Sequence, residues 1–170
     1  EFLLDIKKGL SVIRQGQIEN PFREIREDII KTAYASYISE LSDKILDPLT
    51  VEISLYEQFE HTLRWIETKS IDTVIIPILM YELKLYEKGG FAPETKHCIQ
   101  CGKINFPIYF SILEGGILCS NCAYIDELAT ELPDNMAKLI HIFKTTPLEL
   151  VRNISVKKEN QILLRGLLDT

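Results

Sequence analysis

The stretch His97–Cys122, HCIQCGKINFPIYFSILEGGILCSNC, contains all four cysteines of the chain. They form two Cys-x-x-Cys pairs, Cys98 with Cys101 and Cys119 with Cys122, and seventeen residues separate the pairs. This spacing matches the two-knuckle zinc pattern. Two residues between paired thiolates allow a tight turn to bring both sulfurs onto one ion at about 2.3 Å. The stretch therefore predicts a structural Zn²⁺ site whose ligands are Cys98, Cys101, Cys119 and Cys122.

Other uses of four thiols stay open from the residues alone. A disulfide framework requires an oxidising compartment, an all-sulfur shell also accepts iron, and a redox enzyme requires an accessible thiol of low pKa. His97 is a further candidate ligand, although four thiols already complete a tetrahedral shell. A zinc ion held by four thiolates has no position left for water, so it is predicted to stabilise a loop and to catalyse nothing.

Two short β-prone segments lie between the cysteine pairs. PIYFSI, residues 107–112, and GGILC, residues 115–119, are joined around LEGG and predict a small hairpin. Such a hairpin cannot bury a core by itself, and metal binding contributes on the order of 10 kcal/mol to the folding of elements of this kind. We therefore expect a zinc-ribbon-like β-hairpin module.

The remainder of the chain is predicted to be mainly α. Residues 20–45 begin with Asn20 as a candidate N-cap and Pro21 at the first helical position, and Pro48 ends the helix. Apolar side chains recur at every fourth residue of this helix and predict one buried stripe. The stripe consists of Ile25, Ile29, Ala33, Tyr37, Leu41 and Ile45.

Further helices are expected on both sides of the cysteines. Residues 51–67 have one apolar face, and residues 72–88 are apolar on most sides, which predicts the central, most buried helix. Pro77 is expected to kink that helix or to mark its first turn, and Gly89 with Gly90 to end it. Pro133 opens another helix, and shorter ones follow within residues 146–154 and 156–169. The apolar faces are Leu55, Phe59, Leu63 and Ile66 in the first of these helices, and Met136, Leu139, Ile140 and Phe143 in the one after Pro133.

The composition limits the classes of function. The chain has 170 residues, 46% of them hydrophobic, which suffices for one core of ordinary size. With a net charge of −6, the chain lacks the overall positive charge that is typical of a protein that binds nucleic acid by itself. The most apolar run, residues 71–81, is too short to span a bilayer, and residues 1–10 lack the features of a secretory signal. We expect a cytoplasmic protein with no membrane contact.

Several motifs together are similar to one known family. They are REDIIKTAYASYISEL at residues 26–41, GGFAPE at 89–94, and the two cysteine knuckles around FSILEGG. In this order they resemble the RecO family of bacterial DNA repair and recombination mediator proteins. The likeness covers nearly the whole chain.

The resemblance implies a three-part protein with an OB-fold, a helical domain and a zinc-binding insertion. Residues 1–19 would be the end of the OB-fold domain, residues 20–94 and 125–170 the two parts of the helical domain, and residues 95–124 the insertion. The OB-fold itself and a final helix would lie outside this chain. The four cysteines match the zinc positions of the family.

The resemblance also implies a non-enzymatic, nucleoid-associated role. Proteins of this family bind single- and double-stranded DNA, anneal strands, dock to RecR and to the C-terminal tail of the single-stranded DNA-binding protein, and so help to load RecA. The candidate DNA-binding residues are Arg14, Arg23, Arg26 and Lys31, beside the presumed OB-fold domain. Acidic residues interleave with them, so a solvated, salt-bridged face is the alternative interpretation. The interleaved acidic residues are Glu19, Glu24, Glu27 and Asp28.

Two further expectations concern grooves and catalysis. A groove between the helices is expected to take the partner tail, with a basic residue at its rim for a carboxylate. His61 and His141 lie in helical patterns without a nucleophile signature, so no enzyme activity is predicted. The alternative function is a zinc-stabilised protein-interaction scaffold without direct DNA contact.

Overall fold

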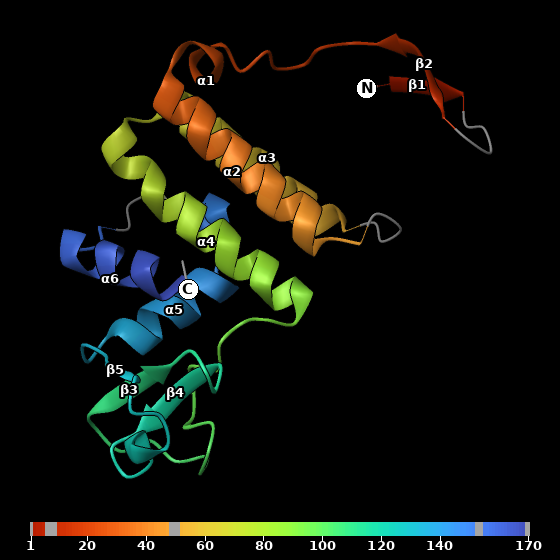
Figure 1. Ribbon diagram of the computed structural model, residues 1–170. Helices are drawn as coiled ribbons and strands as arrows, with labels where there is room; N and C mark the ends of the chain where they lie inside the picture. Colours follow the sequence, from red (N-terminus) through yellow and green to blue (C-terminus); the bar gives the residue numbers. More distant parts are fainter. Residues whose placement is uncertain (1, 6–9, 48–51, 152–154, 169–170) are drawn as a thin grey trace.

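The computed structural model describes residues 2–5, 10–47, 52–151 and 155–168, and these residues are mainly helical with two small antiparallel sheets. A long helix, α4, crosses the middle of the molecule (Figure 1). The N-terminal helices pack on one side of it, and the cysteine region, with its sheet, lies at the end of the molecule opposite α1 (Figure 1). In chain order the helices are α1 (Arg23–Glu27), α2 (Ile29–Ile45), α3 (Ile53–Thr68), α4 (Ile71–Gly89), α5 (Met136–Thr145) and α6 (Lys158–Leu168), with short 3-10 helices η1 (Ala123–Ile125) and η2 (Leu148–Leu150).

Helix α4 is the central helix, as its apolar sequence predicts. Ten of its residues are buried, including the fully buried Glu82. Gly90 follows it in the left-handed conformation at φ 79°, which a glycine adopts without steric cost. Pro77 lies inside the helix and does not mark its first turn. The position of the helix therefore agrees with the prediction to within about a residue at each end.

Opposite faces of α4 belong to two different hydrophobic cores. The N-terminal core joins α4 to α1, α2 and α3, through buried residues that include Ile38, Ile66 and Ile78. The C-terminal core joins α4 to α5, α6, η2 and the sheet of the cysteine region. The predicted apolar faces of α3 and α5 are confirmed, since Leu55 and Ile66 are buried in the first core and Met136, Ile140 and Phe143 in the second.

The predicted stripe on the first long helix is partly wrong. Ile29 is 81% exposed and Tyr37 is 36% exposed, whereas Ile38 is completely buried. A spacing of four residues exceeds the 3.6 residues of a helical turn, so a stripe drawn at every fourth position drifts around the helix. The side chains of α2 that reach the core are Ile38, Tyr34, Ala35, Leu41 and Ile45.

The start of that helix also differs from the prediction. Asn20 does not cap a helix; its side chain accepts a hydrogen bond from the amide of Phe22, which has a left-handed φ of 45°. A short α1 follows and ends at Glu27, with Asp28 as its C-cap. Asp28 is the N-cap of α2, because its carboxylate accepts hydrogen bonds from the amides of Ile30 and Lys31. One predicted helix is therefore two, divided at an aspartate.

The predicted hairpin between the cysteine pairs is confirmed. β3 (Ile108–Ser111) pairs antiparallel with β4 (Gly116–Cys119), and the turn between them includes Gly115 at φ 74°. A third strand that the sequence pattern did not indicate, β5 (Thr130–Glu131), pairs with the other edge of β3. Ile108, Phe110 and Ile117 of the sheet are buried in the C-terminal core, so the sheet is attached directly to the helices.

A second sheet lies at the N-terminus. β1 (Phe2–Asp5) and β2 (Val12–Gly16) form an antiparallel pair, and every residue of β2 is exposed. An extended segment connects this hairpin to α1, and the hairpin stands away from the helices (Figure 1). Over the described residues, no helix combines the length and the apolar character that crossing a membrane requires.

Candidate metal centre and lysine groove

Two tight turns position the four cysteines. In the first knuckle the amide of Gly102 donates to the carbonyl of Cys98 at 2.8 Å, and Gly102 has φ 72°, a conformation that glycine adopts readily. In the second knuckle the amide of Cys122 donates to the carbonyl of Cys119 at 2.8 Å. The first knuckle is attached to the sheet, since the amide of Ile99 donates to the carbonyl of Ile117 on β4. The local turns therefore orient each pair, and the hairpin brings the pairs together.

The four sulfurs converge on one point. All four Sγ atoms lie within 4.8 Å of one another, and Sγ of Cys101 is 3.7 Å from Sγ of Cys119. Four sulfurs at about 2.3 Å from a central ion would be separated by about 3.8 Å at the edges of the tetrahedron. The donor set therefore fits a tetrahedral Zn²⁺ ion, which Cys98, Cys101, Cys119 and Cys122 would hold. His97 is exposed and does not belong to this cluster.

The thiols influence one another electrostatically. Burial opposes ionisation of Cys98, but hydrogen bonds from the backbone amides of Cys119, Cys101 and Gln100 outweigh it and lower the pKa of this thiol to about 6. Burial and the neighbouring thiols raise the pKa of Cys122 to about 12. Without a cation, the cluster therefore favours ionisation of Cys98 and opposes ionisation of Cys122. Only a bound cation compensates the charge of four thiolates at this spacing.

A polar contact and a backbone bridge connect the cysteine region to its surroundings. Oγ of Ser111 on β3 donates to Oδ2 of Asp126 at 2.6 Å, and Oδ1 of Asp126 accepts from the amide of Leu128 at 2.9 Å. Glu94, just after α4, bridges to Gly116 on β4. These contacts extend from Glu94 to the segment after Cys122, so both ends of the module are joined to its sheet.

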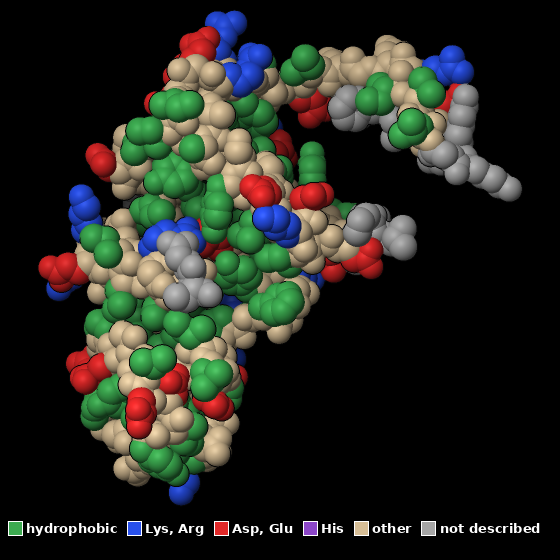
Figure 2. Space-filling model, in the orientation of Figure 1, with side chains coloured by type: hydrophobic (Ala, Val, Ile, Leu, Met, Phe, Trp, Pro, Cys, Tyr) green, Lys and Arg blue, Asp and Glu red, His purple; other side chains and the backbone are tan. Residues whose placement is uncertain are grey.

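The four candidate DNA-binding residues do not form one patch. Arg14 lies on the N-terminal hairpin, where its guanidinium is 2.9 Å from the carboxylate of Asp5. Arg23 and Arg26 lie on α1 and are exposed, and Nζ of Lys31 donates to the carbonyl of Glu67 at the end of α3. Acidic and basic side chains are mixed at the end of the molecule that carries α1 (Figure 2). The structure therefore brings Arg23, Arg26 and Lys31 to one end and separates Arg14 from them.

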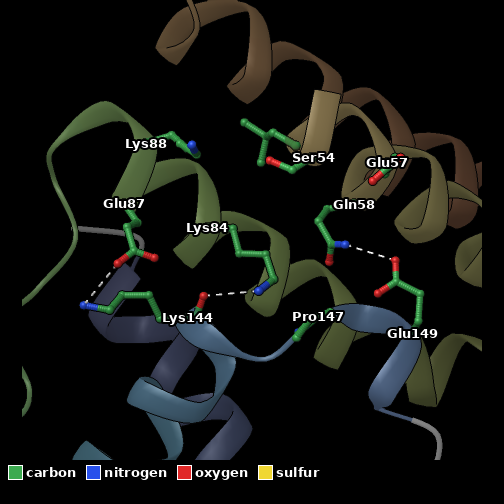
Figure 3. A pocket seen from close by; sticks show the side chains of 10 residues that line it. Ser54, Glu57, Gln58, Lys84, Glu87, Lys88, Lys144, Pro147 and Glu149 are labelled. Carbon is green, nitrogen blue, oxygen red and sulfur yellow. Dashed lines mark hydrogen bonds and ion pairs between the residues drawn. The ribbon is translucent and has the colours of Figure 1, made fainter. Parts of the chain in front are cut away.

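A groove between α3, α4 and the segment from α5 to η2 has a cavity volume of about 470 Å³ (Figure 3). We call it the lysine groove, because Lys84, Lys88 and Lys144 line it. Nζ of Lys84 reaches across to the carbonyl of Lys144 at 3.1 Å, and burial lowers the pKa of Lys84 (Figure 3). The other lining residues are Ser54, Leu55, Glu57, Gln58, Glu87, Pro147 and Glu149.

Side chains from α3 hold the far wall of the lysine groove in place. Nε2 of Gln58 donates to Oε1 of Glu149 at 3.0 Å, and Oε1 of Gln58 accepts from the amide of Leu148. Nε2 of His61 lies 3.0 Å from the same oxygen of Glu149. No sequence pattern indicates this wall, because Gln58 and Glu149 are ninety-one positions apart. A local signal is Lys84, a cation in the second half of a helix that is apolar on most sides.

The fold and the site define a class of protein. Its members are mainly helical and carry a small sheet with a cluster of four cysteines. Within that class, the chain belongs to the family described as "Recombination protein O C terminal", whose model matches residues 26–170. The resemblance that the motifs indicated is thereby confirmed.

Three curated relatives illustrate the extent of the match. The "DNA repair protein RecO" of Oceanobacillus iheyensis is 48% identical over 167 residues, which cover 98% of this chain and 64% of the relative. The protein of the same name from Exiguobacterium sibiricum is 31% identical over 95% of this chain and 64% of the relative. That from Bacillus cereus is 33% identical over 99% and 67%. The chain thus spans about two thirds of the length of these relatives.

Proposed function

We propose that this chain is the helical and zinc-binding part of a non-enzymatic mediator of DNA repair and homologous recombination. The observation that carries the proposal is the family match over residues 26–170, together with relatives named DNA repair protein RecO. The relatives are longer than this chain, and the proposed division follows the family. Residues 1–19 end an OB-fold domain, residues 20–94 and 125–170 form the helical domain, and residues 95–124 are a zinc-binding insertion.

The proposed role of zinc is structural. Four cysteine sulfurs supply a complete tetrahedral shell, so the ion would have no open position for a substrate or a water molecule. A bound zinc ion would neutralise the thiolates and hold the two knuckles against the sheet. This chemistry supports a protein that acts by binding other molecules, and the proposed partners are DNA, RecR, the single-stranded DNA-binding protein and, indirectly, RecA. Such a protein would work in the cytoplasm, at the nucleoid.

The lysine groove is the proposed binding site for the acidic C-terminal tail of the single-stranded DNA-binding protein. Leu55 and Pro147 offer apolar contact, and Lys84 and Lys88 offer cations for carboxylates. The half-buried ammonium of Lys84 is the stronger candidate, because a charge interaction gains strength where water is excluded.

Fluorescence anisotropy of a labelled tail peptide, titrated with this chain at two salt concentrations, tests that assignment. We expect saturable binding that weakens with salt. The variants Lys84→Gln and Lys88→Gln should each weaken it by about tenfold, in keeping with the loss of a charge-assisted contact. Lys103→Gln is the matched control, because Lys103 lies between the two cysteine pairs and does not line the groove. Equal affinities for all four proteins would remove the lysine groove as the site.

Arg23 and Arg26 are the proposed contacts to DNA phosphates, together with Lys31 and Arg14. Both α1 arginines are exposed at the end of the molecule that carries α1, to which an extended segment joins the N-terminal hairpin (Figure 1). Each phosphate contact contributes about one unit to the slope of log affinity against log salt concentration. The double variant Arg23→Gln/Arg26→Gln should therefore lower that slope by about two in a titration with a labelled double-stranded oligonucleotide.

The alternative function, an interaction scaffold without direct DNA contact, has support from two ion contacts. Arg14 is paired with Asp5, and Lys31 is bonded to the carbonyl of Glu67. Under this alternative, the oligonucleotide either does not bind or binds with an affinity that salt does not change. The same titration therefore separates the two functions.

A further inference from the structure

A second groove lies on the other side of α3 and consists of two adjoining cavities. One cavity, about 270 Å³, is bounded by α2, α3 and α4, and the other, about 420 Å³, lies between α3 and residues 16–22. Tyr56 and Phe59 line both cavities, so the two cavities share a wall. We call the pair the aromatic groove.

The aromatic groove differs in charge from the lysine groove, which is lined by three lysines and three glutamates. Four aromatic side chains and three carboxylates line it, and among the described residues neither of its cavities is lined by a lysine or an arginine. The aromatic side chains are Phe22, Tyr56, Phe59 and Tyr81, and the carboxylates are Glu19, Glu52 and Glu60. Aromatic rings and carboxylates together attract cations, through the ring faces and through charge.

Large apolar side chains at the groove are in contact with water. Tyr56 is 66% exposed and Ile18 is 80% exposed. Exposed apolar and aromatic side chains that gather around a concave surface are characteristic of sites that bind another protein. A free ion or a small polar ligand would not cover these side chains, whereas a peptide segment with an apolar face would.

The two cavities differ in their polar groups. In the smaller cavity the polar groups have partners, since Glu52 is 2.9 Å from Nζ of Lys88 and the hydroxyl of Tyr81 is 2.8 Å from Oγ of Ser42. With Leu46 and Leu55 beside them, this cavity suits an apolar side chain. In the larger cavity, Glu60 is paired with Arg64 across one helical turn at the surface. Such exposed pairs contribute little to stability, so a cation from a partner can compete for Glu60.

We propose that the aromatic groove binds a basic amphipathic segment of a partner protein. An apolar side chain of the segment enters the cavity between α2, α3 and α4. A lysine or arginine about one helical turn away lies against Tyr56 and Glu60 in the second cavity. Helix α3 thus separates two docking surfaces of opposite charge preference, one for an acidic tail and one for a basic segment.

Three labelled peptides of about fifteen residues test this proposal by fluorescence anisotropy. The first is a model amphipathic helix of leucine, alanine and arginine. The second has glutamate in place of each arginine, and the third has alanine in place of each leucine. We expect the first peptide to bind saturably and the other two to bind at least about tenfold more weakly, because each lacks one of the two anchors.

Protein variants locate the binding. Tyr56→Ala should weaken binding of the leucine–arginine peptide by about tenfold or more. Glu60→Lys should weaken it most at low salt. Tyr124→Ala, which removes an exposed tyrosine of the cysteine module, and Lys84→Gln, in the lysine groove, should leave it unchanged. Amide chemical shifts of the unmodified chain give the location independently of any folding defect in the variants, and they should move around Leu46, Tyr56 and Glu60.

Three results would overturn the proposal. They are the absence of binding by the leucine–arginine peptide, equal binding of the arginine and glutamate peptides, and shift changes confined to other surfaces. Binding of the acidic tail at the lysine groove is measured separately. A negative result with the leucine–arginine peptide therefore does not count against the proposed function, and a negative result with the acidic tail does not count against the aromatic groove.

Discussion

Nη1 of Arg165 on α6 lies 2.7 Å from Oε1 of Glu82 on α4, and the side chain of Glu82 is completely buried. Nη2 of the same arginine is 3.2 Å from the hydroxyl of Tyr37 on α2, and its guanidinium lies over the Tyr37 ring at 5.5 Å from the centroid. One arginine therefore links three helices that are distant in sequence. A buried carboxylate is tolerated only with such a partner.

Removing the arginine should destabilise the chain strongly. Arg165→Met leaves the Glu82 carboxylate buried without its cation, and we expect the free energy of unfolding to fall by about 3 kcal/mol. Arg64→Met, which breaks the exposed pair with Glu60, should cost less than about 1 kcal/mol. Urea denaturation measures both. A double variant, Glu82→Leu/Arg165→Met, should recover most of the loss. Similar costs for the two single variants would show that Glu82 does not depend on Arg165.

Tyr37 should make stability fall in alkaline solution. Burial, and then the charge of Glu82, raise the pKa of Tyr37 to about 12, although Arg165 opposes this shift. Since the folded state holds the phenol proton more tightly than the unfolded state, with its pKa near 10, this stabilisation is complete below pH 10. It is lost as the pH rises from about 10 to about 12.

The variant Tyr37→Phe should reduce this alkaline fall without abolishing it, because burial also raises the pKa of Tyr81. Urea denaturation at a series of pH values checks the expectation. In an absorbance titration of the folded chain, the variant should lack one phenol group whose pKa is about 12. An unchanged alkaline slope in Tyr37→Phe would contradict the assignment.

Loss of the metal should loosen the cysteine module more than the helices. Under the zinc proposal, Cys101→Ser or treatment with a chelator should speed hydrogen exchange from Cys98 to Cys122, because the knuckles lose their common ligand. The helices keep their own apolar cores, so the circular dichroism of the helices should change little. Lys103→Ala, in the same loop, is the control and should behave like the unmodified chain. A cooperative loss of all helicity would contradict this prediction.

Two glycines offer a matched pair of substitutions. A Cβ at Gly116 would lie 2.7 Å from the carbonyl oxygen of Glu94, which also accepts the amide of Ile117. Gly116→Ala should therefore cost about 1 to 3 kcal/mol, as overpacking against a fixed backbone does. A Cβ at Gly166, on α6, would meet no atom within 4 Å apart from its chain neighbours and the backbone of its own helix, so Gly166→Ala should stabilise the chain by about 0.5 to 1 kcal/mol. Thermal unfolding of both variants should shift in opposite directions, and a shift in the same direction would be inconsistent with the Gly116–Glu94 contact.

The elements that the sequence predicted well are those set by local chemistry. The hairpin, the helix α4 with its glycine end and the convergence of the four cysteines all follow from residues within a few turns of one another. The division of α1 from α2 did not follow, because Asn20 and Asp28 are both suitable caps and local preference does not choose between them.

The features that escaped prediction depend on residues far apart. Glu82 and Arg165 are eighty-three positions apart, and Gln58 and Glu149 ninety-one. No spacing rule connects such positions, since they meet only after α4 has packed against both of its neighbours. The strand β5 is similar: its two residues are too few to form a pattern, and β3 supplies the edge on which they pair.

Because α4 contributes side chains to both hydrophobic cores, it couples the unfolding of the two cores. Unfolding of either core exposes one apolar face of α4 to water, because each core covers a different face of this helix. The helices before α4 and the helices α5, η2 and α6 after it therefore share one melting event, and direct contacts such as Gln58 with Glu149 and Tyr37 with Arg165 join the two groups further. The amides of α4 should be the slowest in the chain to exchange with deuterium, since only complete unfolding uncovers both sides at once.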